Sequence, residues 1–166
     1  MDLVNKSKYN IILGSGSSRR KELLGMTGIN FSVMSIPVDE SFPDSLQGTE
    51  ISEYIVKNKS DAFNNLIKEN EIIITADTLV WFENKCLGKP KDKKEAKYML
   101  KLFAGKSHDV ITSVGFLTTS NFKVLTESTT VIYKNLTDSE IDYYVENVNP
   151  IDLSLIHIWR CRRASL

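Results

Sequence analysis

The sequence has few cysteines and no long apolar run, and each absence argues against a class of protein. Cys86 and Cys161 are the only cysteines among 166 residues, and they have no metal-binding or redox spacing. So few cysteines favour a reducing compartment. No apolar run approaches the length of a membrane span, and the polar start, Met1–Asn10, has no secretory signal pattern. We therefore predict a cytoplasmic protein that has no membrane partner.

A net charge is also absent. Lys+Arg and Asp+Glu number 21 each, so no global excess of charge attracts nucleic acid or an anionic membrane. Basic and aromatic residues do not interleave as they do in nucleic-acid binders, so nucleic acid is not an expected partner. Any anion site must therefore be local. The length and the hydrophobic share of 42% suit one globular domain, or one core with an attached lobe.

The most informative stretch is the loop after a short apolar run, Ile11–Leu13. Two glycines and three serines fill residues 14–18, and the pattern from Arg19 onward indicates a helix. Free N–H groups at a helix start, serine hydroxyls and the Arg19-Arg20 pair together suit a phosphate. The loop has neither the Walker A ending nor the third glycine of a dinucleotide fingerprint. The alternative is an ordinary strand–turn–helix corner.

A helix is predicted over Thr49–Lys68 because apolar residues recur on one side of it. This stripe consists of Ile51, Ile55, Ala62, Phe63 and Leu66. Lys59 falls inside the stripe. The pattern alone favours a lysine that extends past the edge of the core into solvent, and the alternative is an ammonium held at a site under the helix.

A buried strand is predicted over Glu71–Thr75, where three consecutive isoleucines are typical of a strand covered on both faces. It delivers Ala76-Asp77-Thr78 at its carboxyl end, where ligands collect in open α/β sheets. Asp77 is therefore a candidate for chemistry. The alternative is a capping or turn aspartate.

The other elements are predicted from strand-forming runs, turn residues and capping boxes. The strands are Phe31–Ile36, which runs into a turn at Asp39 and Glu40, a hairpin of Leu79–Phe82 and Cys86-Leu87, and the long pair Val110–Leu117 and Phe122–Tyr133. The helices start at the capping pairs Asp92/Glu95 and Thr137/Glu140 and end near Ala104 and at Asn147. Phe42–Gly48 is a loop, and Gly88-Lys89-Pro90 is a rigid turn that presents a lysine. This order predicts a mixed α/β sheet.

Six motifs in register resemble those of the Maf family of nucleoside triphosphate pyrophosphatases. They are Ser15-Gly16-Ser17-Ser18-Arg19-Arg20, Val38-Asp39-Glu40, Lys57-Asn58-Lys59, Ala76-Asp77-Thr78, Gly88-Lys89-Pro90-Lys91-Asp92 and Ser107-His108-Asp109-Val110-Ile111-Thr112. The resemblance spans Asn10 to Asp152. It implies an elongated, ITPase-like α/β fold, in which helices flank a mixed sheet with a central nucleotide cleft.

The resemblance also implies a function and the residues that carry it. The activity is cleavage of a nucleoside triphosphate at the α-phosphate to the monophosphate and pyrophosphate with Mg²⁺ or Mn²⁺. The Arg19-Arg20 pair and the Ala-Asp-Thr form resemble the branch that acts on dTTP and UTP. The implied roles are substrate binding by Ser15, Ser17, Arg19, Arg20 and Thr78, metal and water binding by Glu40 and Asp77 with Asp77 as the base, and charge neutralisation by Lys59 and Lys89.

The chain departs from the family pattern in two places. Ser18 stands where the family usually has proline, and the family's Lys-Ala-Gly segment and Gly-Ile-Gln-Gly loop do not follow Asp152. We expect a Maf-like domain over residues 1–152 that is incomplete at its C-terminus, and a tail over 153–166 that resembles translated vector or adapter sequence. A last strand with a frayed end is the other interpretation of this tail.

Two other functions stay open. One is a nucleotide-binding regulatory module without turnover, and the other is a pyrophosphatase for 7-methyl-GTP or other modified nucleotides. A homodimer is a further expectation.

Overall fold

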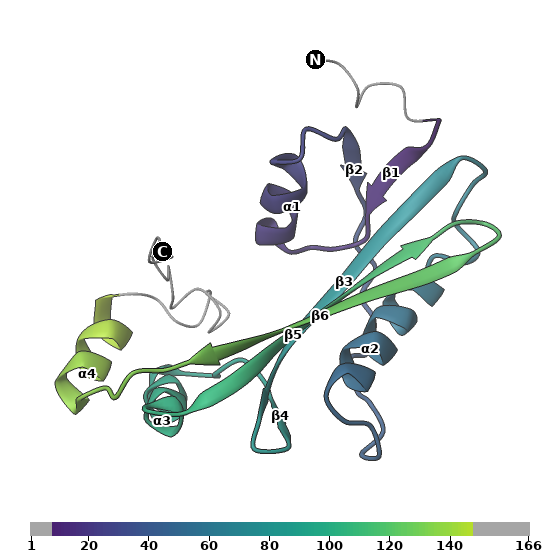
Figure 1. The fold of residues 1–166 in the computed structure, drawn as a ribbon. Coiled ribbons are helices and arrows are strands. Elements are labelled where there is room, and N and C mark those ends of the chain that lie inside the picture. Colours follow the sequence, from purple (N-terminus) through teal and green to yellow (C-terminus); the bar gives the residue numbers. More distant parts are fainter. Residues whose placement is uncertain (1–7, 148–166) are drawn as a thin grey trace, which may run out of the picture. The chain divides into compact units, whose positions relative to one another are not determined.

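The computed structural model describes residues 8–147, so the tail predicted over 153–166 lies outside the described residues. Within 8–147 the chain forms six strands and four helices (Figure 1). In chain order they are β1 (Asn10–Leu13), α1 (Ser18–Gly25), β2 (Phe31–Val33), α2 (Thr49–Asp61), β3 (Glu71–Phe82), β4 (Lys85–Leu87), α3 (Lys93–Phe103), β5 (Ser107–Leu117), β6 (Phe122–Ile132) and α4 (Asp138–Asn147). None of the helices in this part of the chain has the length and apolar character that crossing a membrane requires.

The strands form a mixed sheet in the order β2-β1-β3-β5-β6, and β4 pairs with β3. β1 runs parallel to β2 and to β3, whereas β4 runs antiparallel to β3. This arrangement confirms the predicted mixed α/β sheet with helices. The expected central nucleotide cleft stays a prediction.

β3 is longer than the sequence pattern indicated, and this changes the position of Asp77. The predicted strand ended at Thr75, but β3 continues through strand-forming residues to Phe82 and turns into β4 through Glu83 and Asn84. Both turn residues have a positive φ, 47° and 61°, as a tight hairpin turn requires. Asp77 therefore lies in the middle of a strand. The neighbouring strand β1 ends before this point, because its pairing with β3 stops at Leu13 and Ile74.

Two other predicted elements are shorter than expected. β2 ends at Val33 instead of Ile36, because its partner β1 ends at Leu13, whose carbonyl accepts the last bond from Met34 N at 3.0 Å. α2 ends at Asp61 instead of Lys68. The Asp61 carboxylate accepts a hydrogen bond from the Asn64 amide at 3.3 Å, and i→i+3 backbone bonds replace the helix there. Asparagine at 64 and 65 favours this ending.

The predicted stripe on α2 is therefore confirmed only in part. Ile51, Ile55 and Phe63 are buried, and Leu66 is 53% exposed beyond the helix end.

The two capped helices match their predictions. Asp92 accepts from Glu95 N at 2.8 Å before α3, and Glu140 N donates to Thr137 Oγ1 at 3.3 Å at the start of α4. Gly105 ends α3 with a φ of 70°. The hairpin between β5 and β6 closes through Thr118 N and Asn121 O, 2.8 Å apart.

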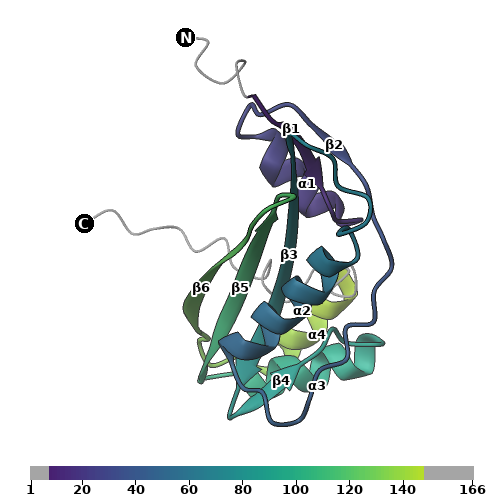
Figure 2. The ribbon, with the colours of Figure 1, turned by 90° about the vertical axis from the view of Figure 1, so that its right-hand side faces the viewer.

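Two compact units make up the described chain, and each has its own core. The first unit comprises residues 8–79 and 111–128, and the second comprises 80–110 and 129–147. The core of the first unit is Ile12, Phe63, Ile73 and Leu117. The core of the second unit is Val80, Phe82, Ala96, Met99, Leu100, Phe103, Tyr133, Ile141 and Val145. In the first unit α2 lies along β3, as both ribbon views show (Figure 2).

Candidate functional site

The serine-rich loop after β1 folds back on itself in the first unit. Ser17 caps α1 by accepting from Arg20 N at 3.4 Å. Ser17 N and Arg20 Nη1 both donate to the hydroxyl of the buried Ser15, at 3.2 and 3.4 Å. A Cβ on Gly14 would lie 3.0 Å from the side chains of Phe63 and Thr75, so the start of the loop packs closely on its neighbours. The loop thus holds the Arg20 guanidinium next to the Ser15 hydroxyl.

Lys59 holds two carboxylates together under α2. Its Nζ lies 2.7 Å from Asp77 Oδ1 and 2.8 Å from Glu40 Oε1. The side chains of Lys59 and Asp77 are only 15% and 11% exposed, whereas that of Glu40 is 61% exposed. The interpretation that Lys59 extends into solvent is therefore wrong, and its ammonium is held at a site under the helix.

Arg20 belongs to the same electrostatic environment. Burial lowers the pKa of Arg20 below its ordinary value, and the negative charges of Asp77 and Glu40 act in the opposite direction. The loop and the Lys59 cluster therefore form one site with two cations and two carboxylates. The two cations are the groups of this site that can bind phosphate oxygens, and the two carboxylates balance their charge in the free site.

Glu40 is presented by a tight turn in the segment between β2 and α2. Ser41 N and Ser41 Oγ donate to the two carboxylate oxygens of Asp39 at 2.9 and 2.8 Å. These hydrogen bonds, the backbone one first, lower the pKa of Asp39. Asp39 thus has a structural partner of its own, and Glu40 is the carboxylate that reaches Lys59.

The remaining predicted residues lie in different surroundings. Thr78 follows Asp77 on the opposite face of β3, and its hydroxyl lies 3.1 Å from that of Thr112. Arg19 is exposed and pairs with Glu22 at 3.0 Å, and its role in substrate binding stays a prediction. Lys89 is exposed and belongs to the second unit, and its place in the site stays a prediction.

The donor set fits a hard divalent cation. Glu40 and Asp77 direct oxygens to one point, which the Lys59 ammonium now occupies. Residues 8–147 hold no group of three or more His, Cys, Asp or Glu residues that could bind a metal ion. Mg²⁺ is commonly bound by one or two carboxylates together with substrate phosphates. The two carboxylates therefore suit a cation that binds jointly with a phosphate-bearing substrate.

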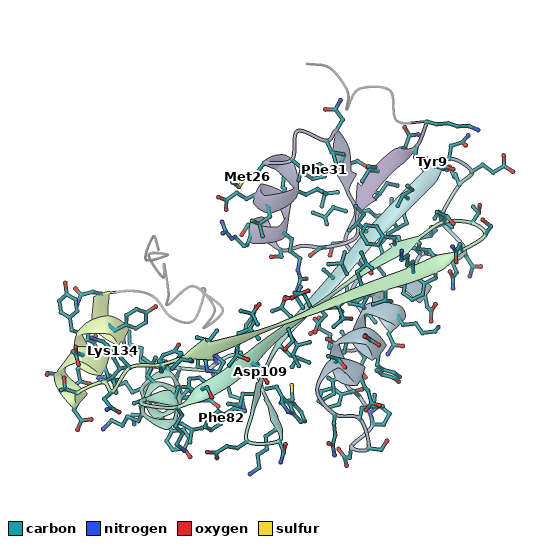
Figure 3. All side chains as sticks on the ribbon, viewed as in Figure 1. Tyr9, Met26, Phe31, Phe82, Asp109 and Lys134 are labelled. Carbon is teal, nitrogen blue, oxygen red and sulfur yellow. The ribbon has the colours of Figure 1, made fainter. Side chains whose placement is uncertain are left out.

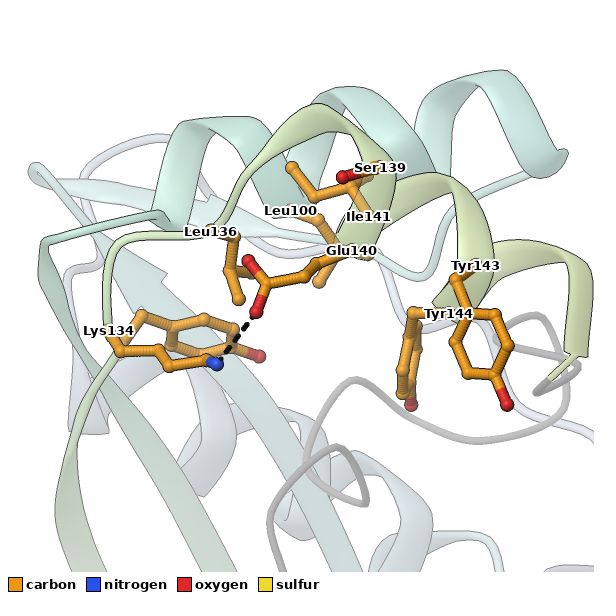
Figure 4. Close-up of a pocket in the computed structure, with 9 residues that line it drawn as sticks. Leu100, Lys134, Leu136, Ser139, Glu140, Ile141, Tyr143 and Tyr144 are labelled. Carbon is orange, nitrogen blue, oxygen red and sulfur yellow. Dashed lines mark hydrogen bonds and ion pairs between the residues drawn. The ribbon is translucent and has the colours of Figure 1, made fainter.

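The second unit contains a separate pocket of about 380 Å³ (Figure 4). Its lining is Leu100, Tyr133, Lys134, Leu136, Ser139, Glu140, Ile141, Tyr143 and Tyr144. Lys134 and Glu140 form an ion pair at 2.9 Å. The buried hydroxyls of Tyr133 and Tyr144 have no hydrogen-bond partner among the described residues, and burial raises the pKa of both. None of these nine residues was among the predicted site residues.

One serine and one threonine that the motifs did not indicate lie close in sequence to Lys59 and Asp77. Ser60 and Thr75 are fully buried, and their hydroxyls lie 2.6 Å apart. No sequence signal marks them, because serine in a helix and threonine in a strand are common. The contact between these two hydroxyls follows only from the packing of α2 on β3.

Comparisons with known proteins agree with these motifs. A family model described as Maf-like protein matches residues 10–154. A Bacteroides thetaiotaomicron protein named dTTP/UTP pyrophosphatase is 45% identical over 151 residues, which cover 90% of this chain and 78% of the relative. A Flavobacterium johnsoniae protein of the same name is 43% identical over 145 residues, covering 87% and 75%.

A solved structure supports the fold alone. The Staphylococcus aureus Ham1 protein superposes with a TM-score of 0.55 at 11% identity, over 78% of this chain and 72% of that protein. The family itself is shown by the matched family model and by the two relatives. The chain belongs to the Maf family.

Proposed function

We propose that this chain hydrolyses nucleoside triphosphates, dTTP and UTP in particular, at the α-phosphate to yield the monophosphate and pyrophosphate. The observation that carries the proposal is the contact of Lys59 with Asp77 and Glu40 in the electrostatic environment of Arg20. The names of the relatives from B. thetaiotaomicron and F. johnsoniae support the choice of substrates.

The loop and the cations bind the triphosphate in this proposal. Ser15 and Ser17 supply hydroxyls, and α1 supplies N–H groups at its start. Arg20 offers a planar fork that fits phosphate oxygens, and Lys59 offers a point charge. Arg19 adds further positive charge once substrate is present, and the role of Lys89, which belongs to the second unit, stays a prediction. Phosphate oxygens then replace part of the carboxylate contacts that Lys59 makes in the free site.

Asp77 is the proposed general base. A water oxygen attacks the α-phosphorus, a proton of that water passes to an Asp77 oxygen, and the bond from the α-phosphorus to the bridging oxygen breaks to release pyrophosphate. Lys59 and Arg20 stabilise the charge that develops on the phosphate oxygens. Asp77 and Glu40 would hold a divalent cation, which would supply charge shielding and would lower the pKa of a water molecule bound to it.

The test is a product analysis with a panel of nucleotides. The purified chain is incubated with dTTP, UTP, CTP, ATP, GTP and 7-methyl-GTP, each with Mg²⁺, Mn²⁺ or a chelator, and products are resolved by ion-exchange chromatography. We expect equimolar monophosphate and pyrophosphate, fastest from dTTP and UTP, and no turnover with the chelator. Nucleotide binding by calorimetry without pyrophosphate release would instead support a regulatory module. A preference for 7-methyl-GTP would assign the other branch.

We also propose a homodimer, on the basis of apolar surface in the first unit. α1 buries none of its residues, and Met26 at its end is 76% exposed (Figure 3). Val33 on the edge strand β2 is 45% exposed. Exposed apolar surface next to a sheet edge favours association. Analytical ultracentrifugation of the chain and of a Met26→Lys variant tests this, and a wild-type monomer at all concentrations contradicts it.

A further inference from the structure

α2 packs on the sheet through a stripe of small residues in the first unit. Ser52, Val56 and Ser60 are spaced four residues apart and are all fully buried. A Cβ on Gly115 of β5 would lie 2.6 Å from Val56 Cγ1 and 2.9 Å from Thr75 Oγ1. The absence of a side chain at position 115 therefore allows the helix to approach β3 and β5 closely.

Two buried hydroxyl pairs join the helix to these strands. Ser52 Oγ lies 2.7 Å from Ser113 Oγ of β5, and Ser60 Oγ lies 2.6 Å from Thr75 Oγ1 of β3. Thr75 Oγ1 also donates to the Val56 carbonyl at 3.4 Å. The serines are eight residues apart, about two helical turns. The two pairs are thus chemically alike and hold α2 at two separate places.

Only one of the two pairs lies beside the ion pair of the candidate site. Ser60 directly follows Lys59 in α2, and Thr75 precedes Asp77 by two residues, so Thr75 and Asp77 point to the same face of β3. Thr75 Cγ2 is also 3.0 Å from the position of a Cβ on Gly14, where the serine-rich loop begins. Thr75 therefore contacts α2 and the start of that loop while sharing a strand with Asp77.

We propose that Thr75 and Ser60 are positioning residues that fix the Lys59 ammonium against Asp77. This proposal rests on the proposed function for its effect on catalysis. Neither hydroxyl contacts substrate, because both are fully buried. A lysine side chain has four rotatable bonds between its backbone and its ammonium. The position of the Lys59 ammonium against Asp77 therefore depends on how firmly the backbone of α2 is held at Lys59. Misplacement of a catalytic group by about 1 Å can lower a rate about 10²-fold.

Four variants test the proposal on the full chain. Thr75→Val keeps the shape of the side chain and removes its hydroxyl, and Thr75→Ser keeps the hydroxyl. Ser60→Ala and Ser52→Ala are matched, since each removes one buried hydroxyl from the same helix. We expect Thr75→Val and Ser60→Ala to lower kcat by about 10-fold or more with KM changed less than about 2-fold. Thr75→Ser should retain most of kcat, and Ser52→Ala should lower Tm while kcat stays within about 2-fold.

A purely structural role gives a different result. If Ser52→Ala lowers kcat as much as Ser60→Ala does, or if Thr75→Ser fails to rescue kcat, the positioning role is overturned.

A second measurement does not depend on turnover. In a double-mutant cycle, Lys59→Met is made in the wild-type and Thr75→Val backgrounds, and urea midpoints are compared. We expect Lys59→Met to lower the urea midpoint less in the Thr75→Val background than in the wild type. Equal decreases in the two backgrounds would overturn the positioning role. If the wild-type chain releases no pyrophosphate from any triphosphate, the proposed function fails, and this cycle still decides the positioning role.

Discussion

Replacement of Lys59 by methionine is the perturbation whose consequences the structure defines best. Methionine keeps an unbranched side chain and removes the ammonium that contacts Asp77 at 2.7 Å and Glu40 at 2.8 Å. The Asp77 side chain, 11% exposed, then loses its ion-pair partner. The variant should therefore lose stability and pyrophosphate release together.

The magnitude follows from burial. Removal of one partner from a fully buried ion pair costs about 3–5 kcal/mol. Lys59 retains 15% exposure and the Arg20 cation remains nearby, so we expect a loss near the lower limit, about 3 kcal/mol. For a chain of this size that loss lowers Tm by about 6–12 °C. The double variant Lys59→Met/Asp77→Asn should be more stable than Lys59→Met, because no unpaired buried charge is left.

The assay is thermal unfolding followed by circular dichroism, with Lys57→Met as the matched control. Lys57 lies on the same helix and pairs with Asp61 at 2.6 Å, but both side chains are exposed, 59% and 44%. An exposed pair contributes about 0–1 kcal/mol, so the control should lower Tm by no more than a few degrees. A Tm for Lys59→Met equal to that of Lys57→Met, or a double variant less stable than Lys59→Met, would show that no buried ion pair is lost.

Three further changes test separate parts of the account. Asp77→Asn should lower pyrophosphate release at least about 10²-fold while calorimetry still detects nucleotide binding, and near-normal release would remove Asp77 from the mechanism. Arg20→Ala should weaken triphosphate binding more than monophosphate binding, because its fork contacts phosphate oxygens, and equal weakening would argue against that role. Burial against Phe103 lowers the pKa of His108, so the unfolded chain binds this proton at a higher pH than the folded chain does. Stability should therefore be full above about pH 6.5 and fall below it, and His108→Phe should flatten the fall in urea midpoint between pH 7.5 and 5.5. An unchanged pH dependence in His108→Phe would contradict this assignment.

Capping motifs in the sequence were sufficient to predict where helices begin when the capping residues bond to their own helix. The pairs Asp92/Glu95 and Thr137/Glu140 satisfy N–H groups of their own helices, so α3 and α4 begin where the capping pattern predicts. α2 and β3 were harder to delimit. The end of α2 depends on a side-chain bond from Asn64 to Asp61, and the length of β3 depends on its pairing with β4.

The sequence identified single residues of the site but not the contacts between them. Asp77, Glu40 and Arg20 could each be selected from motifs, whereas periodicity alone placed Lys59 in solvent. Its ammonium lies under α2 because two carboxylates distant in sequence meet there, and periodicity along one helix carries no information about such a meeting. Ser60 and Thr75 were missed for the same reason, since 15 residues separate them and only the packing of α2 on β3 joins their hydroxyls.

The most direct test of the central claim is the position of oxygen from solvent in the products of UTP hydrolysis. The chain is incubated with UTP and a divalent cation in ¹⁸O-labelled water, and the products are examined by mass spectrometry and phosphorus NMR. We expect one labelled oxygen on the phosphate of UMP and none on pyrophosphate, and at least about 10²-fold less labelled UMP with Asp77→Asn. Label on pyrophosphate, or products other than UMP and pyrophosphate, would contradict it.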